Sequence, residues 1–448
     1  MARILIAGAG HGGVVAAIKL SSAGHDVTIF EKEDKDNIGL AQSDSFSADA
    51  FAYADIPIPD GFKYAKNRLT FVPLGKETKP ITMPEPNDEN IIANRKELIG
   101  YLLFLAENSG VKIIYNAKIT APIILGSRVC GLKTDCGDFY GDMIIDACGV
   151  NSPLRTSLPD FMNITQATKK FDTVYTYRAF FENDKTALQP ENYYNLYIKD
   201  NGTEGFSWVI TEDDKVDVLI ARFSPITNDI ILTKLRELDE DNPQMSKKFL
   251  GGIYGEIPVR QPLAVFVADG YAAVGDSAFM TYAIKGSGIE YAVKAGVMLA
   301  DAINSDEEGL FTAETLWEYE RRFFKEIGFS ACRIALLKNI LPYITAQDVD
   351  DLFNAGLATT EELNEFMGNK LESIFSAKGL SFIKDKVKLI RENSLLKETL
   401  SDFVKWIGRL AVVETYFPNK YNRKDIAKWV DKYNGFFEDI KKSEENSD

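Results

Sequence analysis

The chain has 448 residues, of which 45% are hydrophobic, and this allows a substantial core spread over roughly two or three domains. Its 51 basic and 66 acidic residues give a net charge of −15, which opposes general binding to nucleic acid or to anionic membrane surfaces. Only two histidines and four cysteines are present, and no CxxC pair occurs. A His-rich metal site is therefore excluded, and a His-based catalytic triad is disfavoured.

The beginning of the chain bears on its location. Met1–Ile6 enters an apolar run at once, without the charged region, long apolar region and cleavage site of a secretory signal. No uninterrupted apolar stretch approaches the ~20 residues that span a bilayer. We therefore expect a cytoplasmic protein that is not integral to a membrane.

The first elements predict the opening of a doubly wound α/β sheet. Arg3–Ala7 is typical of a buried strand, residues 8–13 of a glycine turn, Val14–Ser22 of a helix and Val27–Phe30 of a second strand. This order gives parallel strands joined by a right-handed crossover. Residues 33–60 are predicted to form a loop.

The middle of the chain is dominated by predicted strands. Residues 68–83 indicate a hairpin outside the first sheet, and Leu98–Asn108 has the spacing of a helix. The strands that follow predict a three-stranded segment outside the main sheet and then a further strand within it. Several later strand-like runs predict an antiparallel sheet. The predicted strands are Val111–Tyr115, Ile119–Leu125, Val129–Thr134, Met143–Ala147, Val174–Phe181, Tyr193–Ile198, Ser207–Ile210 and Val216–Phe223.

From about residue 306 the apolar spacing becomes helical, with aromatic stripes that are typical of a core. The predicted helices include Glu314–Lys325, Ala331–Leu341, Glu361–Phe366 and Leu395–Val412. We expect an α/β fold, α+β overall, with a Rossmann-like parallel sheet, an antiparallel-sheet substrate domain and a helical C-terminal region. The predicted boundaries are 1–62, 91–165 and 263–305 for the first domain, 63–90 and 166–262 for the second, and 306–448 for the third.

The glycine turn has the GxGxxG spacing of a dinucleotide-binding site. Gly8 permits the tight turn, Gly10 lets backbone N–H groups approach a pyrophosphate, and Gly13 allows the helix to pack closely on the strand. Glu31 ends the second strand, where a carboxylate can bind a ribose hydroxyl. The alternative is a tight structural turn followed by a solvated Glu. The candidate residues are Gly8, Ala9, Gly10, His11, Gly12, Gly13, Glu31 and Lys32.

A second constellation lies much later in the chain. The short apolar strand at Tyr271–Val274 ends in Gly275 and Asp276, and Gly286–Ile289 precedes a helix. An Asp at a strand end can accept a hydrogen bond from a polyol such as ribitol, and a Gly-rich helix N-terminus can support the negative charge of a reduced flavin. The alternative for Gly275 and Asp276 is an ordinary turn.

These segments carry a family resemblance. Ile257–Leu263, Ala268–Gly270, Val274–Ala278 and Gly286–Ile289 closely resemble the geranylgeranyl reductase family of flavoproteins, over roughly residues 1–303. That family shares its broad fold with aromatic monooxygenases of the para-hydroxybenzoate hydroxylase type. The resemblance implies an extended FAD, with Asp276 on the ribitol and with Gly286, Ser287, Gly288 and Ile289 beside the flavin ring.

The segment Asp146–Arg155 is similar to the middle fingerprint of these reductases and hydroxylases, with Gly149 in register. Hydroxylases usually carry Asp directly before this Gly, where the family assigns it to FAD and NADPH handling. Cys148 stands there instead, which favours a reductase. Arg95 matches the Arg that precedes the first-domain helix in the family, and the resemblance places it near the flavin linker. The alternative is a surface Arg.

Two further positions concern the substrate. The segment Phe206–Thr211 resembles a degraded form of the aromatic YxWxFP element that lines the reductases' cavity, so Trp208 is a candidate for that role or for core packing. Lys285 stands beside the turn at Gly286, where the family usually has Pro. It is a candidate for stabilising an anionic reduced flavin or for binding an acidic substrate group, and the alternative is a solvent-facing Lys.

The sequence thus predicts an FAD-dependent oxidoreductase, in which flavin N5 delivers a hydride to a C=C bond or similar acceptor in a prenyl-like, lipid-like or aromatic substrate. Electrons would come from NAD(P)H or a small redox protein. The alternatives are an FAD-dependent aromatic monooxygenase and a non-catalytic prenyl-binding or lipid-binding escort on the same fold. We expect a small apolar substrate and no nucleic acid. Peripheral membrane contact by the helical region stays open, and the sequence does not give the oligomeric state.

Overall fold

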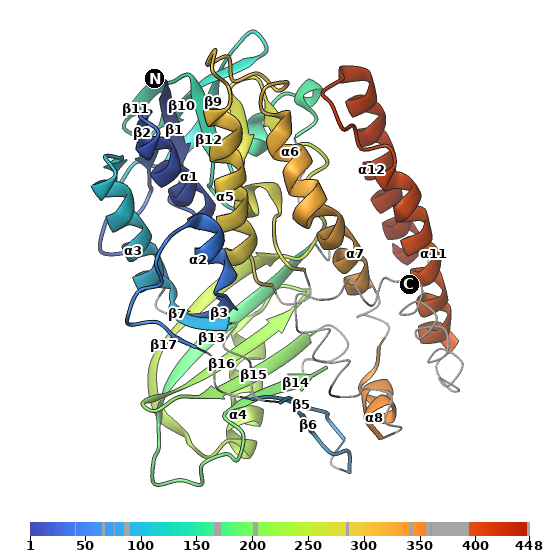
Figure 1. Cartoon of the computed structure of the whole chain (residues 1–448). Helices are drawn as coiled ribbons and strands as arrows, with labels where there is room; N and C mark the ends of the chain where they lie inside the picture. Colours follow the sequence, from blue (N-terminus) through green and yellow to red (C-terminus); the bar gives the residue numbers. More distant parts are fainter. Residues whose placement is uncertain are drawn as a thin grey trace.

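The computed structural model shows two large sheets with helices packed around them (Figure 1). A parallel sheet with its helices occupies the top of the view, the long strands of an antiparallel sheet lie below it, and the C-terminal helices run along one side. The described residues are 1–40, 42–64, 68–75, 77–84, 90–164, 172–199, 205–283, 286–339, 344–354, 360 and 394–445.

The first sheet has six strands in the order β18-β19-β12-β1-β2-β8. Its centre is parallel, because Ile6 of β1 pairs with both Ile29 of β2 and Ile145 of β12. All but the first residue of β1 are buried, which explains its continuous apolar sequence. The strands are β1 (Arg3–Ala7), β2 (Asp26–Phe30), β8 (Lys112–Ile114), β12 (Met143–Asp146), β18 (Val267–Ala268) and β19 (Tyr271–Ala273).

Three helices pack with this sheet, namely α1 (His11–Ser22), α3 (Arg95–Asn108) and α5 (Ile289–Asn304). The predicted strand, turn, helix and strand at the beginning of the chain are confirmed, with the helix starting at His11 rather than Val14. A separate three-stranded antiparallel sheet in the order β11-β10-β9 is present, but β11 was not predicted, and the predicted strand at Val111–Tyr115 corresponds to β8 of the six-stranded sheet. The strands of the three-stranded sheet are β9 (Ile119–Leu125), β10 (Arg128–Thr134) and β11 (Gly137–Tyr140).

The prediction of a loop over residues 33–60 is wrong in part. This segment contains β3 (Ser43–Ser47) and α2 (Asp49–Ala54), and β3 pairs with β7 (Asn90–Asn94), which also pairs with β4 (Lys63–Tyr64). Only Phe46 of β3 is buried, so the strand has little local pattern of its own. Pairing with a distant segment stabilises β3, and local periodicity does not report such pairing.

The second large sheet has seven strands in the order β17-β13-β16-β15-β14-β5-β6. The predicted strands and the hairpin of β5 and β6 are confirmed, whereas β17 and α4 (Asn228–Asp241), which packs on this sheet through Leu238, were not predicted. The strands are β5 (Leu69–Val72), β6 (Ile81–Thr82), β13 (Thr173–Asn183), β14 (Tyr194–Ile198), β15 (Gly205–Thr211), β16 (Lys215–Arg222) and β17 (Met245–Pro258).

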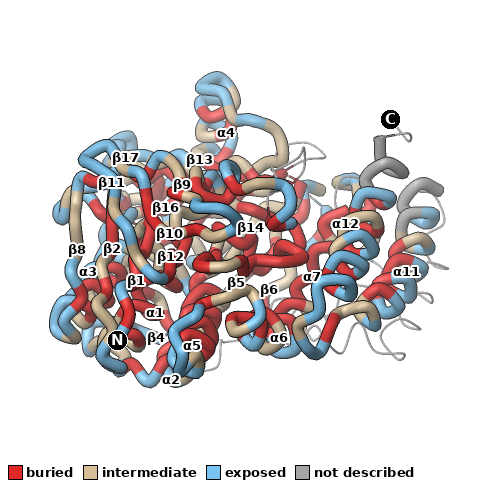
Figure 2. The backbone as a smooth tube through the Cα atoms, turned by 90° about the horizontal axis from the view of Figure 1, so that it is seen from above, coloured by how far each residue is buried: buried red, intermediate tan, exposed pale blue. Residues whose placement is uncertain are grey.

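The predicted helical C-terminal region is confirmed within the described part of the chain, whereas the helix predicted at Glu361–Phe366 lies outside it. Its aromatic residues are core, since Trp317 and Tyr319 are buried. The buried sides of the last two helices face the rest of the molecule (Figure 2). The elements are α6 (Trp317–Phe323), a π-helical turn (Phe324–Gly328), α7 (Phe329–Leu337), α8 (Ala346–Asn354), α11 (Ser394–Glu414) and α12 (Arg423–Glu445).

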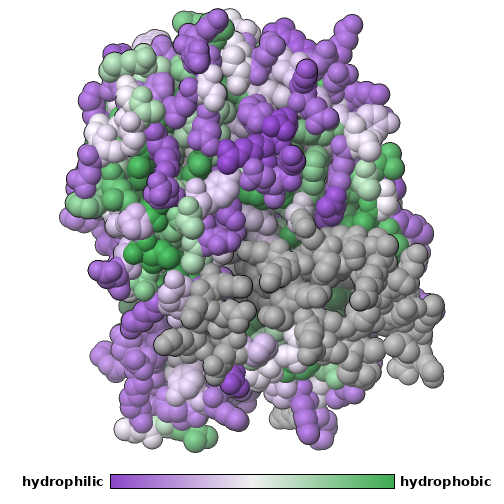
Figure 3. Space-filling view, in the orientation of Figure 1, coloured by the Kyte–Doolittle hydropathy of each residue, from purple (hydrophilic) through white to green (hydrophobic). Residues whose placement is uncertain are grey.

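The last helix is tied to the segment that follows β17. Trp429 Nε1 donates to the carbonyl oxygen of Ala264 at 2.8 Å, and the Tyr433 hydroxyl donates to that of Pro262 at 2.8 Å. Among the helices described, none has the length and apolarity needed to cross a bilayer. On the face in Figure 3, hydrophobic residues form separate groups among hydrophilic ones.

Candidate cofactor and substrate cavity

A cavity of about 2840 Å³ is lined by residues of both large sheets. Ligand pockets usually occupy about 300–1,000 Å³, so this cavity has room for a dinucleotide and a second ligand. It brings together nearly all the predicted site residues that the structure describes, both those near the beginning of the chain and those at 276–289. They are Gly8, Ala9, Gly10, His11, Gly12, Glu31, Lys32, Arg95, Gly149, Trp208, Asp276, Gly286, Ser287, Gly288 and Ile289.

The glycine turn forms a cradle that side chains would fill. Gly8 has a φ of 83°, and a Cβ on Gly10 would lie 2.8 Å from the carbonyl oxygen of Ala147. A Cβ on Gly12 would lie 2.6 Å from that of Ala292. No side chain caps the N-terminus of α1, which leaves its first N–H groups for an anion. The cradle therefore fits a pyrophosphate.

Gly13 does not line the cavity. A Cβ there would lie 2.6 Å from the Ala147 side chain and 3.1 Å from that of Ile6, so Gly13 lets α1 pack closely on the sheet. This close packing is the role that the sequence motif gives it.

Glu31 is bound to the glycine turn. Its Oε2 accepts the backbone N–H of Ala9 at 2.9 Å, and its Oε1 accepts that of Glu33 at 2.9 Å. Each carboxylate oxygen has two lone pairs, so Glu31 can still accept a ribose hydroxyl from the cavity. Lys32 is mostly exposed and pairs with Glu33 at 3.5 Å, at the edge of the cavity.

The late constellation lies in the same cavity. The Thr281 hydroxyl donates to Asp276 Oδ1 at 2.9 Å, and a Cβ on Gly288 would lie 3.1 Å from the same oxygen. Burial raises the pKa of the Asp276 carboxyl, and the Thr281 bond and the charge of Arg95 oppose this rise. Gly286 has a φ of 64°, and Ile289 begins α5. Asp276 and the glycine turn before α5 therefore form one surface of the cavity.

Asp146 organises this surface, although the sequence did not single it out. Its carboxylate is fully buried and accepts the hydroxyl groups of Ser277 at 2.9 Å and of Tyr271 at 2.7 Å, together with that of Ser152. Ser277 in turn accepts the backbone N–H of Gly149 at 2.9 Å. Asp146 thus ties the middle fingerprint to the turn that carries Asp276. In the sequence, the feature that could have indicated this role is the acidic residue at the end of an otherwise apolar strand.

Cys148 lies against the first strand. Its thiol contacts the carbonyl oxygen of Ala7 at 3.4 Å, and burial, followed by the charge of Asp146, raises the pKa of the thiol well above its usual value. The position that carries a carboxylate in hydroxylases therefore holds a neutral thiol in this chain.

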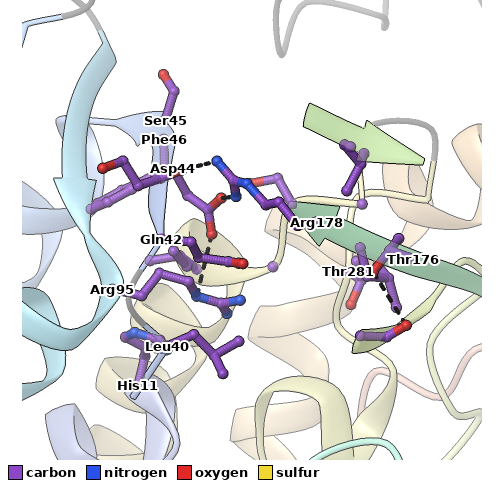
Figure 4. A pocket seen from close by; sticks show the side chains of 18 of the residues that line it. His11, Leu40, Gln42, Asp44, Ser45, Phe46, Arg95, Thr176, Arg178 and Thr281 are labelled. Carbon is purple, nitrogen blue, oxygen red and sulfur yellow. Dashed lines mark hydrogen bonds and ion pairs between the residues drawn. The ribbon is translucent and has the colours of Figure 1, made fainter. Parts of the chain in front are cut away.

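A series of ion pairs joins Arg95, Asp44 and Arg178 at the wall of the cavity (Figure 4) and continues to Asp217. Arg95 Nε pairs with Asp44 Oδ2 at 3.3 Å, and Asp44 Oδ1 accepts from Arg178 Nη1 at 2.9 Å. Arg178 also binds the fully buried Asp217 through Nε at 2.8 Å. Arg95 lines the cavity, and its side chain is 32% exposed. Asp44, Arg178 and Asp217 were not predicted from the sequence. Asp217 could have been noticed as a charged residue within an apolar strand.

His11 is a neutral imidazole at the glycine turn. Burial, and next the charge of Arg95, lowers the pKa of His11 to about 3, against an opposing effect of Asp44. Its Nε2 is buried and has no hydrogen-bond partner among the described residues. An unpaired buried nitrogen at this point of the cavity is consistent with a site for a ligand that carries polar atoms.

Where the cavity lies over the seven-stranded sheet, its lining includes an apolar cluster. Trp208 of β15 packs near Val174 and Leu219, and its ring lies 6.1 Å from that of Tyr194 and 5.4 Å from the Arg178 guanidinium carbon. Its Nε1 is buried without a partner among the described residues. Trp208 thus both lines the cavity and packs in a cluster. Lys285 lies outside the described residues.

Comparison with known proteins agrees with this arrangement. The family of NAD(P)-binding Rossmann-like domains matches residues 6–53. The chain is 24% identical to digeranylgeranylglycerophospholipid reductase of Haloferax volcanii over 66% of this chain and 74% of that protein. It also resembles the crystal structure of a geranylgeranyl bacteriochlorophyll reductase-like protein of Thermoplasma acidophilum, with a TM-score of 0.72, 20% identity, and coverage of 87% of this chain and 99% of that one.

The resemblance to geranylgeranyl reductases is confirmed. The predicted fold is confirmed as well, and these matches support an oxidoreductase similar to geranylgeranyl reductases. A variant of HpxO from Klebsiella pneumoniae, complexed with FAD, has the same fold, with a TM-score of 0.62, 16% identity, and coverage of 83% of this chain and 99% of that one.

Proposed function

We propose that this chain is an FAD-dependent reductase that transfers a hydride from flavin N5 to a C=C bond, or a similar acceptor, of a largely apolar substrate. The observation that carries the proposal is one cavity in which a dinucleotide cradle at Gly8–Gly12 meets an apolar wall at Trp208. In this proposal the six-stranded sheet belongs to the FAD-binding domain and the seven-stranded sheet to the substrate domain.

The residues divide the binding of FAD among them. The glycine turn and the N-terminus of α1 would hold the pyrophosphate, Glu31 the adenosine ribose, and Asp276 the ribitol. The turn at Gly286–Ile289 and the N-terminus of α5 would lie beside the flavin ring. When bound, FAD supplies the two-electron hydride chemistry, and the protein supplies orientation and charge.

The apolar wall would bind the substrate and exclude water from the reacting bond. Phe206, Trp208, Leu219 and Ile257 project into this part of the cavity from the central strands and from β17. The name of the Haloferax volcanii relative specifies a digeranylgeranyl lipid, and a substrate with prenyl chains would suit such a wall. The reducing electrons would come from NAD(P)H or a small redox protein that binds transiently.

The hydroxylase alternative shares the fold and the cofactor but consumes oxygen. The neutral thiol of Cys148 favours the reductase, because hydroxylases of this group use a carboxylate at that position. A non-catalytic lipid-binding escort would not need the unfilled glycine cradle beside Asp276.

Reconstitution and a single turnover test the proposal. The purified protein is expected to take up FAD and turn yellow. After anaerobic reduction with dithionite, a digeranylgeranyl lipid should reoxidise the flavin. Mass spectrometry should show two added hydrogen atoms for each flavin reoxidised, which reduces one double bond with one hydride and one solvent-derived proton. Failure to take up FAD would contradict the proposal, and a hydroxylated product that forms only with oxygen would establish the monooxygenase instead.

A further inference from the structure

Asp44 lies between two arginines that belong to different parts of the cavity (Figure 4). It is on β3, and its Oδ2 pairs with Arg95 Nε at 3.3 Å at the start of α3. Its Oδ1 accepts from Arg178 Nη1 at 2.9 Å on β13 of the seven-stranded sheet. One carboxylate therefore joins the side of the cavity that contains the glycine turn to the side that contains Trp208.

Arg178 is the fixed end of this arrangement. Its side chain is only 5% exposed, and it donates to Asp217 from Nε at 2.8 Å and to the carbonyl oxygen of Ser43 from Nη2 at 2.6 Å. Its guanidinium carbon lies 5.4 Å from the Trp208 ring. Because Arg178 is held by several bonds in a buried setting, it fixes the orientation of the Asp44 carboxylate as well.

Arg95 is the free end. Its side chain is 32% exposed, and Nε is the atom that Asp44 holds. Among the described residues, no hydrogen bond holds its terminal nitrogens, and Asp44 is its ion-pair partner. Its charge lowers the pKa of both His11 and Asp276, so the guanidinium lies within electrostatic reach of the glycine turn and of the predicted ribitol carboxylate. Arg95 also lines the cavity in which the proposed function puts FAD.

We propose that Asp44 is a positioning residue that holds Arg95 by its Nε edge, so that the terminal nitrogens of Arg95 bind FAD, while Arg178 anchors Asp44 to the substrate-binding sheet. The inference rests on the proposed function, since it requires FAD in this cavity. The physical basis is pre-organisation, because a free Arg side chain has many rotamers that binding would have to restrict.

The test measures FAD affinity of the full chain, by quenching of flavin fluorescence on titration of the apoprotein. Asp44→Asn should bind FAD about tenfold more weakly than the unmodified protein, the change that corresponds to ~1.4 kcal/mol. Asp26→Asn is the matched control, because Asp26 also lies between two cations, Lys112 at 2.9 Å and Arg3 at 3.8 Å, with a similar exposed fraction of 30% against 27% for Asp44. Asp26 does not line the cavity, so Asp26→Asn should leave the FAD affinity unchanged.

A double-mutant cycle separates positioning from a direct effect of Asp44. If Asp44 acts through Arg95, then Asp44→Asn should have no further effect on FAD affinity in an Arg95→Gln background. Equal losses in both backgrounds would overturn the inference, and so would wild-type affinity in Asp44→Asn.

Arg95→Lys keeps the charge but has no Nε edge, so it should lose affinity to about the same extent as Asp44→Asn. This variant decides the matter if Asp44→Asn does not fold, and wild-type affinity in Arg95→Lys would overturn the inference. If the unmodified protein does not bind FAD, the proposed function fails instead.

Discussion

Glu31 Oε2 accepts the backbone N–H of Ala9 at 2.9 Å, so the acidic residue directly after β2 is bound to the glycine turn that follows β1. The two parts of the dinucleotide motif are therefore held together before any ligand arrives. Such pre-organisation lowers the cost of ordering the site when a cofactor binds. The predictions that follow test the cradle, the late carboxylate, the apolar wall and one buried acid outside the cavity.

Gly12→Ala should disrupt the cofactor cradle. The new Cβ would lie 2.6 Å from the Ala292 carbonyl oxygen and 2.7 Å from the Val274 side chain, so α1 and α5 must move apart. We expect a loss of about 1–3 kcal/mol in the free energy of unfolding, together with weaker FAD binding. Gly100→Ala is the control, because nothing lies within 4 Å of its Cβ position on α3, and it should stabilise the helix by about 0.5–1 kcal/mol. Urea denaturation measures both, and equal effects would count against the cradle.

Asp276→Ala should weaken FAD binding by about tenfold or more, since a hydrogen bond to a charged group contributes about 1.5–3 kcal/mol. Thr281→Val removes the hydroxyl that donates to Asp276 at 2.9 Å and leaves the carboxylate in place, so it should have a smaller effect on FAD affinity. Isothermal titration with FAD measures both variants. A larger loss in Thr281→Val than in Asp276→Ala would argue against a direct bond from Asp276 to the cofactor.

Trp208→Ala should reduce the binding of apolar ligands by about tenfold or more, because it removes an aromatic surface from the cavity wall. FAD affinity should change little in this variant. Trp208→Phe keeps much of the apolar surface and should retain most of the ligand affinity. Displacement of a fluorescent fatty acid from the FAD-loaded protein provides the measurement. Unchanged ligand binding in Trp208→Ala would move the substrate site elsewhere.

Glu320→Gln should change how stability depends on pH. Glu320 Oε1 accepts the backbone N–H groups of Phe266 at 2.6 Å and Val267 at 2.9 Å, and burial raises the pKa of Glu320 from 4.5 to about 8 against these two bonds. The folded state therefore keeps a proton that the unfolded state loses above pH 4.5. This contribution to stability is complete below pH 4.5 and is lost as the pH rises to about 8, a decrease on the order of a few kcal/mol.

Gln at position 320 keeps an acceptor for both N–H groups but does not titrate. Chemical denaturation at several pH values should therefore show a flatter decline between pH 5 and pH 8 for this variant than for the unmodified protein. Parallel declines would indicate that Glu320 is ionised in the folded state and would contradict the assigned pKa.

The sequence predicted those features whose signal is local. The strand at Arg3–Ala7 and the hairpin of β5 and β6 have apolar periodicity or turn residues of their own, and the glycine turn and Asp276 belong to motifs with fixed spacing. Both motifs lie at the same cavity because each follows a strand of the parallel sheet, and the carboxyl ends of parallel strands meet at one edge of the sheet.

Features that depend on distant contacts were not predicted. β3 is stabilised by pairing with β7 and has only one buried side chain, and the ion-pair series of Asp44, Arg178 and Asp217 joins three strands that are far apart in sequence. Nothing in the residues next to Asp44 indicates that it faces two arginines. Such contacts arise from the tertiary fold, so a single sequence contains no local pattern for them.

The two hydrogen bonds from α12 to the carbonyl groups of Pro262 and Ala264 have a consequence for protein engineering. Removing α12 would leave these two main-chain acceptors without their partners. It would also uncover the Phe324 ring, which Trp429 and Tyr433 contact. The stretch so exposed leads directly into β18 and β19, and Asp276 lies in the turn that follows β19. Truncation before α12 should therefore also perturb the segment that carries Asp276, although this segment lies more than 140 residues earlier in the chain.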